Sequence, residues 1–259
     1  MVEEARSLIR QGDMFQCVLS QRFSAEYSGR PLDYYRNLRV TNPSNYLYFY
    51  DFGDYQIIGA SPESLVSVKQ GQVTTNPIAG TRPRGKDERE DKALAEELLA
   101  DEKEVAEHRM LVDLGRNDIG KIAQNNSVEV TKYMDVEYFR YVMHLTSVVR
   151  GQLLPQLTAM DALKSTLPAG TVSGAPKIRA MKRIYELEQE KRGVYAGAIG
   201  YLSATGDMDV AIAIRTMILK NGRAYVQAGA GIVYDSIPTN EYQETINKAK
   251  SMTKIGEMQ

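Results

Sequence analysis

Hydrophobic residues recur along this chain with two different periods, and the period predicts where helices and strands lie. Apolar side chains three or four positions apart are typical of amphipathic helices, whereas alternating or short continuous apolar runs are typical of strands. The first pattern predicts helices over residues 2–10, 31–38, 88–122 with a break at Asp101, 159–163, 173–189 and 240–254. The second pattern predicts strands over residues 14–23, 46–52, 55–60, 65–68, 73–75, 128–136, 142–149, 197–203, 209–219 and 224–227.

Turn residues and the order of these elements indicate the fold class. Asn221-Gly222 is a strong hairpin signal, and Gln70-Gly71-Gln72 is a second candidate turn. The polar, charged stretch 80–91 is expected to be an exposed loop. Because strands and helices come in clusters and do not alternate strictly, we expect an α+β fold with mainly antiparallel sheet. No repeat, low-complexity tract or linker interrupts the sequence, so we expect a single domain over residues 1–259.

Composition narrows the possible functions. The 259 residues include 32 Lys+Arg and 33 Asp+Glu, a net charge of −1, so the sequence shows no electrostatic signal for nucleic acid or for an anionic membrane. No apolar run approaches the roughly 20 residues of a membrane span, and no charged-then-apolar leader opens the chain. The one cysteine, Cys17, cannot form an internal disulfide, which fits a reducing, cytoplasmic setting and a core position for that residue.

Two pairs of glutamates are the first candidates for chemistry. Glu104 and Glu107 are three residues apart on one predicted helix, and Glu241 and Glu244 are three apart on another, so each pair shares a helix face. Two such faces opposed across a cleft would offer Mg²⁺ the carboxylate oxygens that it prefers. Taken alone, each pair is explained more simply as a solvated helix face.

Two glycine-rich segments are the second candidates. Residues 228–231 follow a predicted strand with the order Ala-Gly-Ala-Gly, and residues 168–177 precede a predicted helix. Backbone N–H groups exposed in such segments bind anions. A tight turn is the simpler explanation for either segment alone, but the two together favour an anionic small-molecule ligand.

Three single side chains are open to a chemical or a structural interpretation. Arg215 lies within an otherwise apolar predicted strand, where it either binds an anion such as a carboxylate or sits at an edge facing water. His144 suits proton transfer, or a core position with a hydrogen bond to backbone. Glu63 suits a general acid if it is partly buried, and is otherwise a turn residue.

The order of the motifs indicates a family. The motifs are residues 12–23, 59–63, 77–84 and 107–114, followed by Pro-Ala-Gly-Thr-Val-Ser-Gly-Ala-Pro-Lys at 168–177 and by residues 229–233. In this order they closely resemble the chorismate-utilising enzymes, and within them the large subunit, component I, of anthranilate synthase. The resemblance extends from about residue 4 to residue 254.

This resemblance implies a fold and a metal site. The implied fold is α+β, with two mainly antiparallel sheets packed together and helices on the outside. The implied cofactor is Mg²⁺, with Glu107 and Glu244 as metal-binding carboxylates, supported by Glu104 and Glu241.

The resemblance also implies how chorismate is held. The carboxylate of its enolpyruvyl arm would be bound by Arg215 and Tyr195, with backbone N–H groups around Gly229 and Gly231. Thr171 and Lys248 would line the same site. The implied catalytic residues are Glu63, which would protonate the departing C4 hydroxyl, and His144, which would lie near the ring and assist.

The implied reaction converts chorismate and ammonia to anthranilate and pyruvate, a lyase step of tryptophan biosynthesis. Ammonia would come from a glutamine amidotransferase subunit, component II, because this chain has no convincing Cys-His-Glu triad of its own. Gln16 replaces the lysine that activates water in isochorismate- and salicylate-forming relatives, and Ala79 replaces the lysine nucleophile of many aminodeoxychorismate synthases. Aminodeoxychorismate synthase component I, an enzyme of the folate pathway, is the first alternative because few residues separate the subgroups.

The length of the chain leaves a second alternative. Component I chains are considerably longer and have an N-terminal region that contributes strands to the shared core. We therefore expect those N-terminal strands to be missing here. A truncated, non-catalytic chorismate-binding remnant is the corresponding alternative, although every implied catalytic position is present.

Overall fold

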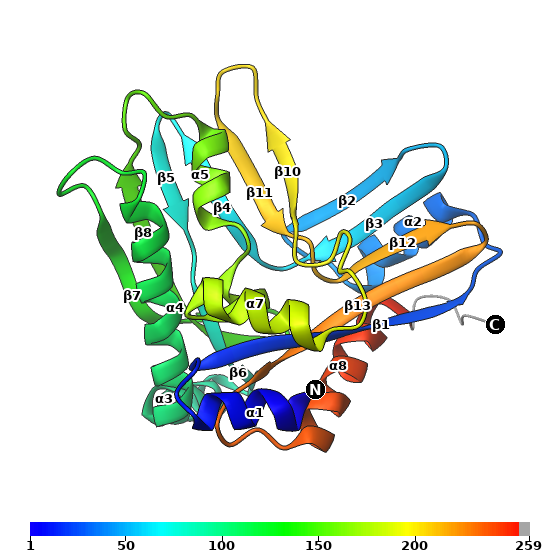
Figure 1. Cartoon of the computed structure of the whole chain (residues 1–259), viewed down its shortest axis with the longest axis horizontal. Helices are drawn as coiled ribbons and strands as arrows, with labels where there is room; N and C mark the ends of the chain where they lie inside the picture. The colour runs from blue at the N-terminus through cyan, green and yellow to red at the C-terminus, as the bar shows by residue number, and fades with distance from the viewer. Residues whose placement is uncertain (254–259) are drawn as a thin grey trace. The chain divides into compact units, whose positions relative to one another are not determined.

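The structure of this protein is a computed structural model that describes residues 1–253. Its contacts group the chain into two compact units, each described here by itself. Unit 1 consists of Met1–Glu63, Pro168–Ile199 and the chain from Ala211 onward, and unit 2 consists of Ser64–Leu167 and Gly200–Val210. The expectation of one domain remains a prediction. Figure 1 labels the elements of both units.

Unit 1 is built on a six-stranded sheet whose paired strands are antiparallel. Its order is β2 (Tyr46–Asp51), β3 (Tyr55–Ser61), β12 (Thr216–Lys220), β13 (Arg223–Ile232), β1 (Gln16–Glu26) and β9 (Gly174–Ala175). Asn221 and Gly222 both have positive φ, 51° and 71°, and close the hairpin between β12 and β13. The predicted Asn-Gly turn is therefore confirmed, because such a two-residue loop needs left-handed backbone at both positions.

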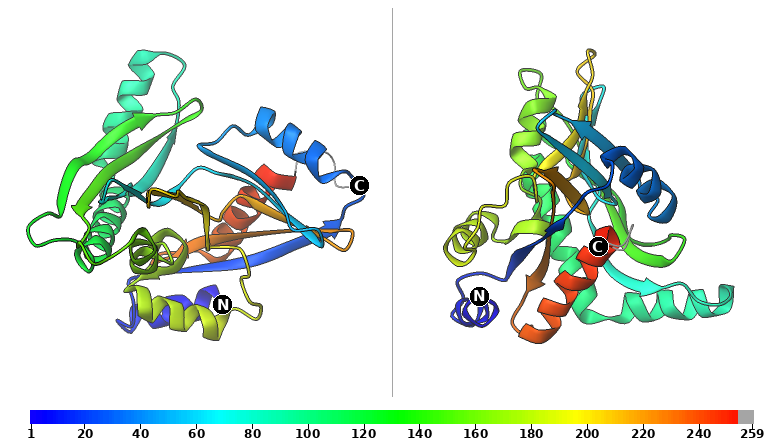
Figure 2. Two further views of the ribbon diagram at one scale, coloured as in Figure 1. Left: turned by 90° about the horizontal axis from the view of Figure 1, so that it is seen from above. Right: turned by 90° about the vertical axis from the view of Figure 1, so that its right-hand side faces the viewer.

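Helices cover this sheet through two buried clusters. The helices of unit 1 are α1 (Val2–Arg10), α2 (Pro31–Thr41), the one-turn α6 (Gly170–Ser173), α7 (Lys177–Leu187) and α8 (Pro238–Thr253). In one cluster, Leu38 of α2 and Met252 of α8 pack with Met217 and Val226 of the sheet. In the other, α1 and α7, blue and yellow-green in Figure 2, pack against β1 around Cys17, a buried free thiol as predicted. The predicted end of the last helix, Lys254, lies outside the described residues.

Unit 2 contains most of the second sheet. In the described residues this sheet has seven strands, in the order β10 (Ala198–Leu202), β11 (Met208–Ile212), β4 (Ser64–Lys69), β5 (Gln72–Thr75), β8 (Val142–Gln152) and β6 (Ile78–Pro83), with β7 (Glu129–Tyr138) also paired to β8. Its helices are α3 (Glu88–Ala100), α4 (Glu102–Gly120) and α5 (Ala159–Thr166). Helix α4 packs on β6 and β8. The pairings around β5 and β8 are antiparallel, so the α+β prediction is confirmed.

Asp101 separates α3 from α4, as predicted. Its carboxylate accepts hydrogen bonds from the backbone N–H groups of Lys103 and Glu104, at 3.1 and 3.2 Å. An N-cap of this kind satisfies donors that the first helical turn leaves without partners. The cap therefore determines where α4 begins, and with it the direction in which Glu104 points. Within residues 1–253, no helix is long and apolar enough to cross a membrane.

The loop expected at 80–91 is wrong, although most of the stretch is exposed as predicted. The stretch contains the end of β6 and the start of α3. Its charges pair with each other and with the helices: Arg82 donates to Glu97 and Asp101, and Arg84 pairs with the buried Asp91. A charged sequence is compatible with regular structure here because Arg82 and Arg84 each have carboxylate partners.

Two further predicted elements have different bounds in the structure. The strand expected over 209–219 is two strands, β11 and β12, separated by a break in which Arg215 has a left-handed φ of 49°. The helix expected from 173 begins at Lys177, because Gly174, with φ of 130°, and Ala175 form the short strand β9 against β1. Both breaks occur beside residues that the sequence predicts to bind substrate.

Candidate functional site

Glu63 occupies the short connection between β3 and β4, where its backbone is held firmly. The N–H of Ile212 donates to the Glu63 carbonyl at 3.0 Å, and Ser61 Oγ donates to the Ile212 carbonyl at 2.7 Å. The Glu63 side chain accepts a hydrogen bond from Thr171 Oγ1 at 2.8 Å. Burial raises the pKa of Glu63 to about 7 and outweighs the lowering effects of Thr171, Lys248 and Arg215. The result is a carboxyl group that can carry a proton near neutral pH, as a general acid must.

Arg215 and Tyr195 come together because the break between β11 and β12 pairs with the segment after Tyr195. The N–H of Ala196 donates to the Ala213 carbonyl at 3.1 Å, and the N–H of Ala213 donates to the Gly197 carbonyl at 2.8 Å. Arg215 is therefore not an interior strand residue, which corrects the sequence-based placement. Its partly buried guanidinium is attracted to the charge of Glu63.

The hydroxyl of Tyr195 is a proton donor at neutral pH. Burial raises the pKa of Tyr195 to about 12, so the phenol stays protonated. A protonated phenol and a guanidinium together can bind one carboxylate of a ligand. This combination supports the anion-binding interpretation of Arg215 over the solvent-facing one.

The two predicted glycines of β13 are required for close approach and not for unusual backbone angles. A Cβ on Gly229 would lie 2.6 Å from the Tyr195 hydroxyl and 2.9 Å from the Leu19 carbonyl, and a Cβ on Gly231 would lie 2.7 Å from Gln16 Nε2. Lys248 Nζ donates to the Gly229 carbonyl at 3.0 Å. The structure thus brings Glu63, Thr171, Tyr195, Arg215, Gly229 and Lys248 together within unit 1.

We expect Gly229→Ala to destabilise the fold by about 1–3 kcal/mol, because the added methyl overpacks against backbone that cannot move freely. Thermal unfolding measures this loss as a lower melting temperature. Gly120→Ala is the matched control, since nothing lies within 4 Å of the added carbon and its φ is not left-handed. Equal melting temperatures for the two variants would contradict the packing described for Gly229.

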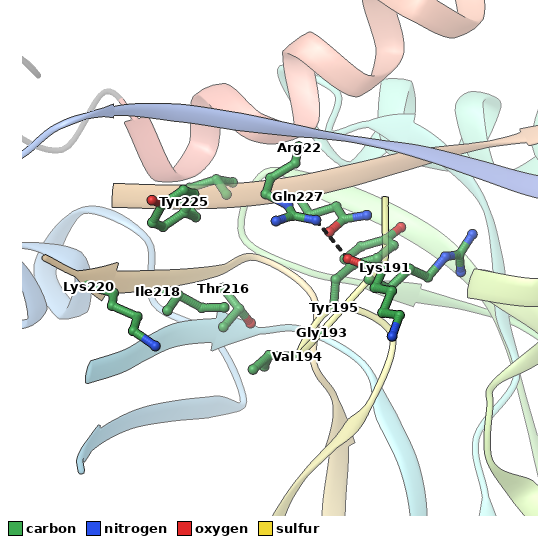
Figure 3. Close-up of a pocket in the computed structure, with 12 residues that line it drawn as sticks. Arg22, Lys191, Gly193, Val194, Tyr195, Thr216, Ile218, Lys220, Tyr225 and Gln227 are labelled. Carbon is green, nitrogen blue, oxygen red and sulfur yellow. Dashed lines mark hydrogen bonds between the residues drawn. The ribbon is translucent and has the colours of Figure 1, made fainter. Parts of the chain in front are cut away.

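A pocket of about 300 Å³ opens in unit 1 beside Tyr195 (Figure 3). Its lining also includes Thr216 of β12 and Gln227 of β13. Arg22, which also lines the pocket, pairs with Glu190 at 2.7 Å and donates to the Lys191 carbonyl at 2.7 Å. Tyr195 is thus in contact with this pocket on one side and is coupled to Glu63 and Arg215 in the predicted substrate site.

In unit 2, the backbone of Gly80 lies between His144 and Glu104. His144 Nδ1 lies 2.8 Å from the Gly80 carbonyl, and a Cβ on Gly80 would come within 3.2 Å of Glu104 Oε2. A carbonyl oxygen can only accept, so Nδ1 carries a proton and donates it to Gly80. The backbone contact predicted for a structural histidine is therefore present, and it involves Nδ1 and not Nε2.

Glu104 and Glu107 lie one turn apart on α4. Burial raises the pKa of the half-buried Glu104, and the charge of Glu107 raises it further. Glu241 and Glu244 belong to α8 in unit 1, where Glu244 is exposed and pairs with Lys248 at 2.5 Å. Among residues 1–253, no three His, Cys, Asp or Glu side chains form a group that could hold a metal ion. Each unit by itself therefore offers a pair of carboxylates.

An ion pair beside this site, Glu188 with Arg192, was not predicted from the sequence. The two residues lie in a charged stretch, Glu188 to Arg192, that has the composition of a solvated surface. The signal that could have identified them is their spacing of four residues directly before the Gly193-Val194-Tyr195 segment.

Comparison with known proteins identifies what this arrangement is similar to. The family model for chorismate binding enzymes matches residues 1–254. Anthranilate synthase component 1 of Lactococcus lactis subsp. lactis is 63% identical over 256 residues, which cover 99% of this chain and 56% of that protein. Its counterpart from Aquifex aeolicus is 55% identical over 258 residues, covering 100% and 52%. The chain thus spans about half the length of these curated relatives.

Two solved structures are also similar to this chain. The crystal structure of anthranilate synthase component I from Streptococcus pneumoniae TIGR4 has a TM-score of 0.92 and 83% identity, covering 97% of this chain and 56% of that one. The menaquinone-specific isochorismate synthase of Escherichia coli has a TM-score of 0.88 at 26% identity, covering 98% and 59%.

Proposed function

This chain belongs to the chorismate binding enzyme family, and on that premise we propose that it carries the chorismate site of an anthranilate synthase component I. The proposed reaction takes chorismate and ammonia to anthranilate and pyruvate. The observation that carries the proposal is the Glu63 carboxyl group. Its pKa is about 7, it accepts a hydrogen bond from Thr171, and it interacts electrostatically with Arg215. Relatives that are 63% and 55% identical over nearly the whole chain bear this name and support the proposal.

The residues of unit 1 suit the binding of chorismate, which is a dianion. Arg215 and Tyr195 together offer the donors that one carboxylate requires. Gly229 and Gly231 have no side chain, which leaves room for the Tyr195 hydroxyl and the Gln16 amide to approach β13. The backbone of β13 therefore stays accessible to a ligand at these two positions. Lys248, bonded to the Gly229 carbonyl, adds positive charge to the same region.

Glu63 is the proposed proton donor. Loss of the C4 hydroxyl as water requires a proton on the leaving oxygen, and a carboxyl group that is still protonated near neutral pH can supply it. Thr171 orients the carboxyl group through the 2.8 Å hydrogen bond. Gln16 and Ala79 carry no amine at the two positions where relatives use lysine, which favours ammonia as the nucleophile from solution or from a partner.

We propose Mg²⁺ as the cofactor, with Glu107 and Glu244 as ligands and Glu104 and Glu241 in support. The donor set fits, because Mg²⁺ takes hard oxygen ligands and commonly uses one or two carboxylates plus water and substrate oxygens. The repulsion between Glu104 and Glu107, which contributes to the raised pKa of Glu104, is what a cation would relieve. Bound Mg²⁺ would supply a positive charge for a substrate carboxylate.

The proposed partner is a glutamine amidotransferase subunit that supplies ammonia, since component I is named as one component of a synthase in its relatives. The proposed setting is the cytoplasm, which suits the buried free thiol of Cys17. In unit 2, His144 donates from Nδ1 to the Gly80 carbonyl, and we propose that it assists at the ring.

Product analysis tests the proposed function. The purified chain is incubated with chorismate, Mg²⁺ and an ammonium salt, and the products are separated by chromatography. We expect anthranilate. An aminodeoxychorismate product would instead support the folate-pathway alternative, and bound but unchanged chorismate would support a non-catalytic remnant.

A further inference from the structure

The ion pair between Glu188 and Arg192 is one of the most enclosed in unit 1. Their side chains are 6% and 17% exposed, respectively. Arg192 Nε donates to Glu188 Oε2 at 2.8 Å, and Nη2 donates to Oε1 at 2.6 Å, in the parallel two-bond geometry that a guanidinium and a carboxylate favour. Removing these two charges from water is costly, so the pair is stable only if further hydrogen bonds offset that cost. Its other contacts therefore indicate its role.

The pair takes the place of a neighbouring strand along the edge of β1. On that edge, β1 is paired with β9 only at Gln16 and Cys17. Beyond this point, the Ser20 N–H donates to Glu188 Oε1 at 2.8 Å, and Arg192 Nη2 donates to the Val18 carbonyl at 2.7 Å. Two backbone groups that a strand would otherwise satisfy are thus bound by side chains, which fixes the pair against the sheet.

The same guanidinium also contacts residues at the proposed substrate site. Arg192 Nη1 donates at 2.6 Å to the carbonyl of Val172, which directly follows Thr171. The Arg192 Cζ atom lies 5.4 Å from the centroid of the Tyr195 ring, within the range of a cation–π contact. Figure 3 shows Tyr195 at the pocket, with Lys191 and Gly193 nearby on the same segment. One planar group is therefore bonded to the Thr171 segment and in contact with the ring of Tyr195.

We propose that the Glu188–Arg192 pair is a positioning device for the substrate site, holding Thr171 against Glu63 and holding the Tyr195 ring in place. Lysine could not replace Arg192 in this role, because an ammonium group cannot make the planar fork and reach the Val172 and Val18 carbonyls together. The kinetic part of this inference rests on the proposed function, whereas the part that concerns Glu63 does not.

Arg192→Lys tests the proposal through the titration of Glu63. The Thr171 hydroxyl lowers the pKa of Glu63, as do Lys248 and Arg215, which the substitution leaves intact. If Arg192 positions Thr171, the variant raises the pKa of Glu63, measured by ¹³C NMR on glutamate-labelled protein with Glu63→Gln to assign the signal. We also expect KM for chorismate to rise and kcat/KM to fall by about 10–100-fold. Arg183→Lys, which alters an ion pair of α7 with Asp13 and Glu186, is the matched control and should leave all three quantities unchanged.

A second comparison separates positioning from general damage to the fold. Thr171→Val removes the hydroxyl but leaves the ion pair, so it should raise the pKa of Glu63 by itself. Adding Arg192→Lys to Thr171→Val should then raise that pKa no further. A wild-type pKa of Glu63 in folded Arg192→Lys, or two shifts that simply add, would overturn the proposal. If Arg192→Lys does not fold, Glu188→Gln replaces it with the same expected results.

The NMR titration remains decisive if the wild-type chain forms no anthranilate. In that case the proposed function fails, while a raised pKa of Glu63 in Arg192→Lys still supports the positioning role.

Discussion

Glu63→Gln is expected to lower anthranilate formation by about 10²–10⁴-fold, the usual contribution of a general acid. Glutamine keeps the shape of the side chain and can still accept the hydrogen bond from Thr171, but it has no proton to give. In the wild-type chain, turnover should fall as the pH rises through about 7, where Glu63 loses its proton. Steady-state kinetics between pH 6 and about pH 9 would measure both effects.

The same substitution should raise stability at alkaline pH. Folded Glu63 keeps its proton up to about pH 7, whereas the unfolded side chain releases it near 4.5. The folded state therefore binds more protons across this range, and stability falls as the pH rises from 4.5 to 7. At pH 8, Glu63→Gln removes a cost of up to about 3 kcal/mol. Glu26→Gln, an exposed control in the same unit, should change neither activity nor stability. If Glu63→Gln were less stable than the wild-type chain at pH 8, the buried environment described for Glu63 would be contradicted.

The second large effect is expected at the carboxylate pair of α4. Glu107→Gln should abolish Mg²⁺-dependent turnover with little change in folding, because it removes a proposed metal ligand and leaves the helix intact. Loss of several kcal/mol of charge stabilisation corresponds to a decrease of at least about 10²-fold. Glu244→Gln on α8 should give the same result. The measurement is the rate of anthranilate formation as a function of Mg²⁺ concentration.

Glu102→Gln is the control for this prediction, since Glu102 is exposed in the first turn of the same helix. It should leave the Mg²⁺ dependence unchanged. Unchanged activity in Glu107→Gln or in Glu244→Gln would remove the metal assignment for that residue.

Much of the fold could be predicted from local patterns. The helix break at Asp101 and the turn at Asn221-Gly222 follow from side-chain capping and from left-handed backbone, which are local effects. The break at Arg215 could not be predicted, because the apolar residues on both sides continue the pattern of a single strand. It forms through hydrogen bonds to a segment that is distant in sequence, between Ala213 and residues 196–197.

The candidate site, like the fold, could be predicted only in part from the sequence. Single residues could be proposed from their chemistry and from the resemblance to a family, and the structure places Glu63, Thr171, Tyr195 and Arg215 in one unit. The pKa of Glu63 depends on burial, which the sequence does not state. The role of Arg192 depends on three carbonyl and carboxylate partners brought together by folding, so its charge alone looked like that of a surface residue.

The most direct test of the proposed function follows anthranilate fluorescence and pyruvate release together, in the wild-type chain and in Glu63→Gln, with chorismate, Mg²⁺ and an ammonium salt. We predict equal amounts of anthranilate and pyruvate from the wild-type chain and a rate lower by about 10²-fold or more from the variant. Equal rates in the two proteins, or consumption of chorismate without anthranilate, would contradict it.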